Sequence, residues 1–206
     1  YGYAIETPAL QRLADEGVTF ETALSPVPMT QPAHTSLFTG LYPGRHGVRD
    51  NVGKTLTDEA VTLAELLREA GYQTGAVVAS KVLARVTGLD QGFESYDDRF
   101  RTEELDSASP NVERRAREVR FSAAEWLKQR DRARPFALFV HFFDVHAPYA
   151  PPPPFARRSG HEDAPRSSTF EDLARQANAH HRALVPGAPG WAELVQQGLP
   201  LELVQG

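Results

Sequence analysis

TQPAHTSLFTGLYPGRHGVRDN, residues 30–51, is the segment from which the rest of this sequence is interpreted. Pro32 is typical of a first helical turn, where its missing N–H would have had no partner. Gly40 is typical of the position just after a last turn, where a left-handed backbone is favoured. Thr30 is therefore expected near the N-cap of a short helix, where free N–H groups and the helix dipole favour an anion. Its hydroxyl is a potential nucleophile at the rim of that site.

The segment resembles the nucleophile motif of the alkaline phosphatase superfamily, which includes the sulfatases and the nucleotide pyrophosphatases/phosphodiesterases. The order Thr-x-Pro-x-His, Thr-Gly-Leu-Tyr-Pro, His-Gly and Asp-Asn is similar to that of the phosphodiesterases, and the separation of Thr30 from Asn51 matches as well. Sulfatases have Cys or Ser at the position of Thr30 and Arg at that of His34. The resemblance implies that Thr30 is the catalytic nucleophile and a metal ligand. It implies that Asn51 contacts the substrate's non-bridging oxygens.

Simpler interpretations exist for the same residues. Helix capping alone explains a Thr at position 30, and a turn explains Asn51 nearly as well as substrate contact does. His34 lies one helical turn from Thr30 on the same face, and it is a candidate for substrate binding, for a base or for simple packing. His46 before Gly47 is expected to fix the loop. The joint register of these residues favours the nucleophile interpretation.

A second constellation follows an apolar segment, residues 136–143, that is predicted to be a strand in the middle of a sheet covered by helices. The residues after it resemble the sulfatase segment in which His-x-Pro follows a buried strand. That resemblance assigns to His146 the catalytic role of protonating the leaving group, a task suited to a near-neutral pKa. His141 is expected to face the other side of the sheet and to be structural.

Lys81 is a weaker candidate for substrate binding. It follows Gly71-Tyr72-Gln73-Thr74, which resembles the strand before a sulfate-binding Lys in many sulfatases. The spacing is longer by two residues, and the usual Gly-Lys-Trp-His is missing. The segment 88–98 resembles a fold-supporting loop of sulfatase-like proteins.

The order of expected elements predicts an α/β fold with a mostly parallel sheet. The resemblance implies the three-layer alkaline phosphatase-like fold, incomplete at both ends, with a partial catalytic domain at 1–155. Residues 156–206 are expected to be a polar loop and helical segment, as an insertion or a continuation. The helices are expected at 7–17, 62–70 and about 109–130, and the strands at 18–23, 72–79 and 136–143.

Composition excludes several classes of protein. The net charge of −5 makes nucleic acid a poor partner, and no apolar run reaches the length of a membrane span. The absence of Cys excludes disulfides, thiol catalysis and the cysteine precursor of formylglycine. It leaves the compartment open, with periplasmic or extracellular locations among the options.

The sequence thus predicts a metal-dependent hydrolase of sulfate or phosphate esters, acting on a small-molecule or glycan ester. The resemblance implies that Thr30 is the only metal ligand present, the others lying outside this chain, so that the segment alone is expected to be inactive. Zinc is favoured, with calcium or manganese as alternatives. The competing hypotheses are a phosphodiesterase or phosphoryl transferase of the same superfamily, a non-catalytic or truncated relative that binds a partner, and a metal-independent hydrolase.

Overall fold

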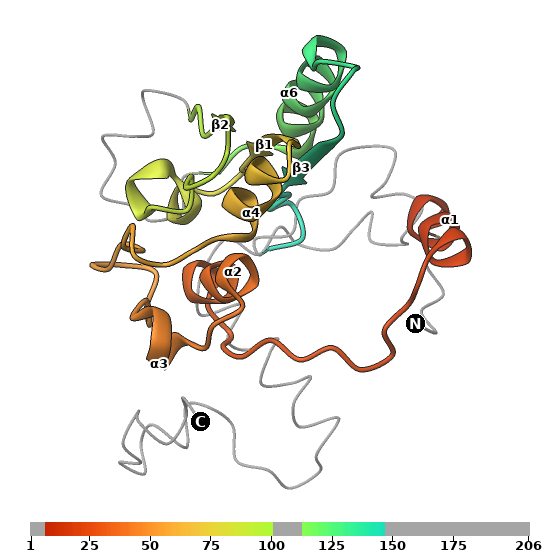
Figure 1. Cartoon of the computed structure of the whole chain (residues 1–206). Helices are drawn as coiled ribbons and strands as arrows, with labels where there is room; N and C mark the ends of the chain where they lie inside the picture. Colours follow the sequence, from red (N-terminus) through yellow and green to blue (C-terminus); the bar gives the residue numbers. More distant parts are fainter. Residues whose placement is uncertain (1–6, 101–112, 147–206) are drawn as a thin grey trace, which may run out of the picture. The chain divides into compact units, whose positions relative to one another are not determined.

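The computed structural model describes residues 7–100 and 113–146 (Figure 1). Contacts divide the chain into two units, Glu6–Phe143 and a second unit formed by Tyr1–Ile5 with Asp144–Gly206. Of the second unit only 144–146 are described, as an exposed turn. The fold below is that of the first unit.

The first unit is built on a parallel sheet of three strands, β1 (Gln73–Val77), β2 (Ser95–Asp97) and β3 (Phe136–Val140). Their order is β2-β1-β3, and β1 pairs in parallel with both neighbours. Along the pairing with β3, Gln73 lies opposite Phe136 and Val77 lies opposite Val140. The expected parallel α/β sheet is therefore confirmed for this part of the chain.

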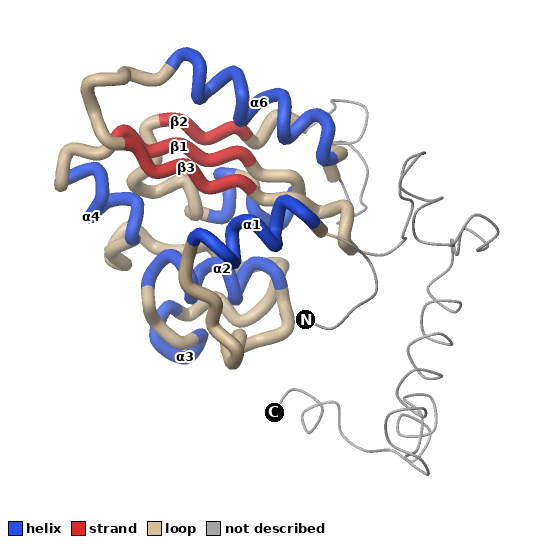
Figure 2. Tube along the Cα trace, turned by 90° about the vertical axis from the view of Figure 1, so that its right-hand side faces the viewer, coloured by secondary structure: helices blue, strands red, loops and turns tan. Residues whose placement is uncertain are grey.

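Helices cover both faces of the sheet, which gives three layers (Figure 2). On one face, Val119 and Ala123 of α6 (Ala116–Gln129) pack against Val77 and Ala79. On the other, Phe38 of α2 (Thr30–Thr39) packs in a cluster with Ala76 and Val78, and α4 (Leu63–Glu69) lies beside β1. The remaining described helices are α1 (Pro8–Glu16), α3 (Pro43–His46) and the short 3₁₀ helices η1 (Lys81–Leu83) and η2 (Arg85–Thr87).

Local signals located several elements well. The capping box that begins α4 is present, since Thr62 Oγ1 accepts from Glu65 N at 3.2 Å and Glu65 Oε2 accepts from Thr62 N at 2.7 Å. The expected helix 7–17 and strand 72–79 correspond to α1 and β1, and the latter is followed by fully buried Val78 and Ala79.

Two expectations about elements were wrong. Residues 18–23 are exposed and form no strand, because an alternating pattern needs a hydrogen-bonded neighbour and the described residues supply none. Residues 113–115 are not helical, since Glu113 bridges Ser80 instead; residues 109–112 lie outside the description. Within the described sheet β1 is central and β3 pairs with β1 alone, so the central position expected for the 136–143 strand stays a prediction.

The loop before β2 supports the fold as the sequence suggested. Gly92 has a φ of +85°, and a Cβ there would lie 2.2 Å from the Glu65 backbone nitrogen of α4. Its carbonyl accepts a hydrogen bond of 2.7 Å from the Thr74 hydroxyl of β1. Only glycine lets this loop touch both the helix and the central strand. Across the described residues, no helix has the length and apolarity needed to span a membrane.

Candidate active site

Helix α2 begins and ends where its sequence indicates. Pro32 lies in the first turn, and Gly40 adopts the left-handed conformation (φ 69°) while its N–H bonds Ser36 O at 2.8 Å. Thr30 is the first helical residue, one position after the N-cap residue Met29. The Thr30 side chain is half-buried, so it lies at the accessible end of the helix.

Asn51 reaches the same turn from the far end of the motif. Its Oδ1 accepts a hydrogen bond of 2.8 Å from the Gln31 backbone N–H. The Gln31 side chain, which is 1% exposed, holds the same loop by donating to Lys54 O at 2.7 Å. Two residues that are twenty positions apart are thus joined at the start of α2, and Gln31 is a contributor that sequence reasoning missed.

The donors of the first turn are largely in use. Gln31 N–H bonds Asn51, Pro32 has no N–H, and Ala33 N–H bonds Met29 O at 3.0 Å. The bond to Gln31 occupies the acceptor end of the Asn51 amide, so its NH₂ group remains the end that can donate to an oxyanion. An anion beside Thr30 would therefore depend more on the Asn51 amide than on the helix N–H groups.

The His34 ring is hydrogen-bonded to the backbone of Thr30, the residue for which it was a candidate base. Its Nδ1 lies 2.7 Å from the Thr30 carbonyl oxygen, so this nitrogen carries the proton and donates. Burial lowers the pKa of His34 below its ordinary value, and the bond to Thr30 opposes that effect only in part. The ring is thus a neutral group with its lone pair on Nε2. Because Nδ1 donates to the backbone, only Nε2 of His34 could accept a proton, and a role of His34 as a base stays a prediction.

His141 meets His34 from the sheet. The two ring centroids are 5.1 Å apart at 86°, and Phe139, on the same side of β3, lies 5.8 Å from His34. Sequence reasoning gave His141 a structural role away from the site. Phe139 and His141 are two residues apart, so their side chains point to the same face of an extended segment. This alternation was the signal that could have placed both of them against α2.

His46 fixes the loop after α2, as expected. Its Nδ1 accepts from Val48 N at 3.1 Å, which leaves the proton on Nε2 for the Ser36 hydroxyl at 3.0 Å. Burial lowers the pKa of this ring as well. His46 thus joins the C-terminal half of α2 to the chain that leads toward Asn51.

The structure gives less information on the remaining two candidates, Lys81 and His146. Lys81 begins η1, after the carboxyl end of β1, and η1 lies beside α2. This is the edge of a parallel sheet at which ligands bind. His146 lies in the exposed turn of the second unit. Its approach to Thr30 therefore stays a prediction.

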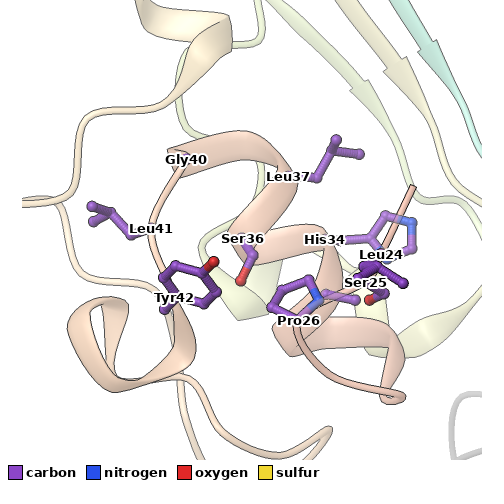
Figure 3. A pocket seen from close by; sticks show the side chains of 10 residues that line it. Leu24, Ser25, Pro26, His34, Ser36, Leu37, Gly40, Leu41 and Tyr42 are labelled. Carbon is purple, nitrogen blue, oxygen red and sulfur yellow. The ribbon is translucent and has the colours of Figure 1, made fainter. Parts of the chain in front are cut away.

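An open groove of about 730 Å³ runs along the outer side of α2 (Figure 3). Its walls are mostly apolar, with His34 and Ser36 contributing polar atoms from the helix. Figure 3 shows Tyr42 and Ser25 on segments that flank the helix. His34 therefore has one side on Phe139 and His141 and also borders an open surface.

The described residues do not form a metal centre by themselves. Among 7–100 and 113–146, no group of three or more His, Cys, Asp or Glu side chains is placed to hold a metal ion. Thr30 would supply a single oxygen, which is fewer ligands than zinc or calcium requires.

Similar folds occur among solved structures. BT4656, solved with D-glucosamine-2-N,6-O-disulfate, aligns with a TM-score of 0.60 at 23% identity, over 73% of this chain and 32% of that protein. The phosphonate monoester hydrolase of Agrobacterium radiobacter aligns with a TM-score of 0.58 at 23% identity, over 76% of this chain and 40% of that protein. This likeness defines the fold class.

The family follows from the sequence comparison. The Sulfatase family model matches residues 1–184, so the chain belongs to the sulfatase family. A curated relative, the N-acetylglucosamine-6-O-sulfatase of Bacteroides thetaiotaomicron, is 25% identical over 159 residues, which are 74% of this chain and 28% of that protein. The chain spans less than half the length of each of these three proteins.

Proposed function

We propose that the full-length protein hydrolyses sulfate or phosphate esters with Thr30 as its nucleophile. One observation carries the proposal: the Asn51 side chain bonds the first turn of α2, 2.8 Å from Oδ1 to the Gln31 N–H, directly beside Thr30. A hydroxyl and a side-chain amide donor then lie at one helix end, which also carries the positive end of the helix dipole. Helix capping alone does not require an Asn from a distant loop.

The reaction would proceed by substitution at sulfur or phosphorus. The Thr30 hydroxyl releases its proton to solvent, and its oxygen forms a bond to the central atom as the bond to the leaving alcohol breaks. The leaving oxygen takes a proton from His146, the residue to which we assign this role. The Asn51 NH₂ group donates to a non-bridging oxygen as charge develops there. Water then hydrolyses the ester on Thr30. Lys81 is proposed as a further contact to the anion, and His34 as a residue that borders the substrate.

A metal is the part of this chemistry that the described residues cannot hold alone. Sulfatases generally use a divalent metal, and a metal beside a hydroxyl lowers the hydroxyl's pKa and so makes it a better nucleophile at neutral pH. We propose Thr30 as one ligand, with the others outside the described residues. Zinc remains the favoured metal, and calcium or manganese are the alternatives.

The available observations support two classes of substrate, sulfate esters and phosphate esters. Relatives that are named as sulfatases favour a sulfate ester, including a glycan ester as in the N-acetylglucosamine-6-O-sulfatase. Thr30 bears a methyl group on Cβ and is not expected to become formylglycine, and His34 stands where sulfatases have Arg. These two residues favour a phosphate ester, a phosphodiester or a phosphoryl transfer as the second candidate.

Replacement of Thr30 tests the proposal. In the full-length protein, Thr30→Ala is expected to lower the turnover of para-nitrophenyl sulfate or phosphate at least about 1,000-fold, because the attacking oxygen is gone. Ser25→Ala is the matched control, since Ser25 is the neighbouring hydroxyl that bonds only its own turn, at Val27 O. Full activity in Thr30→Ala would remove the nucleophile assignment. A wild-type protein that binds but hydrolyses none of these esters would favour the non-catalytic alternative.

A further inference from the structure

His34 is held on two sides that serve different purposes. Its Nδ1–H bonds the Thr30 carbonyl at 2.7 Å, which ties the ring to the residue proposed as nucleophile. The faces and edges of the same ring lie against Phe139 and His141 of the sheet, with centroid distances of 5.8 and 5.1 Å. A shift of the sheet-side contacts would therefore turn the ring and pull on the Thr30 backbone.

His141 is itself fixed to the backbone of the neighbouring strand. Its backbone N–H donates to Val77 O at 2.9 Å, and its ring Nδ1 accepts from the backbone N–H of Ala79 at 3.4 Å. An accepting Nδ1 leaves the proton on Nε2. Burial, with His34 close by, lowers the pKa of His141 to about 4, so the ring is neutral near pH 7. Both rings then have one defined tautomer each, His34 with Nδ1–H and His141 with Nε2–H.

We infer that His141 is a positioning residue for Thr30: anchored on Ala79 and packed edge-to-face on His34, it fixes the ring that holds the Thr30 carbonyl. The inference rests on the proposed function, because it gives His141 a purpose only if Thr30 reacts. It assigns a task that the aromatic neighbours Phe139 and Phe143 cannot perform. Neither of them has an acceptor for a backbone N–H.

Packing alone makes a different prediction from positioning. If only the ring mattered, Phe at position 141 would serve as well as His, since it keeps the aromatic contact. If the nitrogen matters, Gln would serve better than Phe, because its amide can accept from Ala79 and donate toward His34. The two substitutions therefore separate the roles.

The experiment compares these variants in the full-length protein with the para-nitrophenyl ester that it turns over fastest. His141→Phe is expected to lower kcat about 10-fold with KM within about twofold, since displacement of a reacting group costs rate more than binding. His141→Gln is expected to keep kcat within about threefold of wild type. Thr74→Val is the control, because it removes another buried side-chain acceptor for a backbone N–H, that of Glu94 at 3.0 Å, near the start of β1 rather than at the carboxyl edge of the sheet; its kcat is expected to stay within about twofold.

Wild-type kcat in His141→Phe, or a kcat in His141→Gln at or below that of His141→Phe, would overturn the inference. Loss of activity in Thr30→Ala alongside a fully active His141→Phe would remove only the positioning role, whereas an active Thr30→Ala would remove the nucleophile itself. Should His141→Phe fail to fold, the ¹⁵N shifts of the wild-type rings decide. A proton on His34 Nδ1 and on His141 Nε2 supports the inference, and a proton on His34 Nε2 alone overturns it.

Discussion

Strands β1 and β3 are paired over five residues, and β3 (Phe-Ala-Leu-Phe-Val) is more apolar than β1 (Gln-Thr-Gly-Ala-Val), yet β1 is the more buried strand. All of β1 after Gln73 is buried, whereas Phe136 of β3 is 41% exposed and the rest of β3 is half-buried. The reason is the number of neighbours: β1 has a strand on each edge, and within the described residues β3 has one. An apolar pattern thus indicates which side chains of a strand can be buried, while the number of neighbouring strands determines how far they are buried.

The difference also bears on the site, because both strands contribute to it. β1 is followed by buried Val78 and Ala79, and Ala79 provides the N–H that anchors His141. Phe139 of β3 and His141, which directly follows β3, contact His34 of α2. The segment after the more buried strand therefore anchors His141, which in turn contacts His34 of α2.

The largest expected effect on stability is at Gly92, in the loop that contacts both β1 and α4. Gly92→Ala is expected to lower the free energy of unfolding by about 4 kcal/mol, because it combines a positive φ with a Cβ 2.2 Å from the Glu65 backbone. Gly71→Ala is the control, since Gly71 also has a positive φ (+87°) but open space around it; it is expected to cost about 1 kcal/mol. Urea unfolding of both variants measures the difference. Equal costs would show that α4 does not press on this loop.

A smaller effect compares the two strands directly. Val77 and Val140 lie opposite each other and face the same α6 cluster. Val77→Ala is expected to cost about 2 kcal/mol because Val77 is 1% exposed, and Val140→Ala about 1 kcal/mol because Val140 is half-buried. Paired urea denaturation curves test this order. If Val140→Ala costs as much as Val77→Ala, the contrast in burial between the strands does not hold in solution.

The elements fixed by neighbouring residues were the ones predictable from the sequence. The capping box at Thr62 and the helix end at Gly40 each depend on residues within a few positions. The strand expected at 18–23 failed because pairing depends on a distant partner. The ion pair of Arg114 NH1 with Asp97 Oδ1, at 3.1 Å, was missed for the same reason. Neither residue is unusual in its own segment.

The smallest expected effect is a pH dependence that belongs to His141. Its pKa of about 4 in the folded protein lies below the ordinary 6.5, so between these values the unfolded chain binds a proton that the folded chain does not. This contribution to stability is complete above pH 6.5 and is lost as the pH falls toward 4. His34, whose own pKa is lowered by burial, is the titratable group that contacts it.

His141→Phe should therefore flatten the fall in stability between pH 6.5 and 4 by about 1 kcal/mol, after allowance for solvent screening of this partly exposed ring. Thermal unfolding of wild type and variant across that range gives the comparison. Parallel pH profiles for the two proteins would mean that the ring titrates alike in the folded and unfolded chains.

The candidate site shows the same limit of local information. Thr30 and Asn51 were predictable because a motif with matching order and spacing contains both. Gln31 and His141 were not, because their roles depend on the loop at Lys54 and on the end of β1, which fold next to α2 only in three dimensions. The pairing of Thr30 with His146 stays a prediction.

The central claim is that the Thr30 oxygen forms a covalent ester during turnover. Full-length protein mixed with a para-nitrophenyl ester, quenched in acid and digested, can be examined by peptide mass spectrometry. The account predicts a sulfuryl or phosphoryl group on Thr30, absent in Thr30→Ala. Active protein with the group on another residue would contradict it.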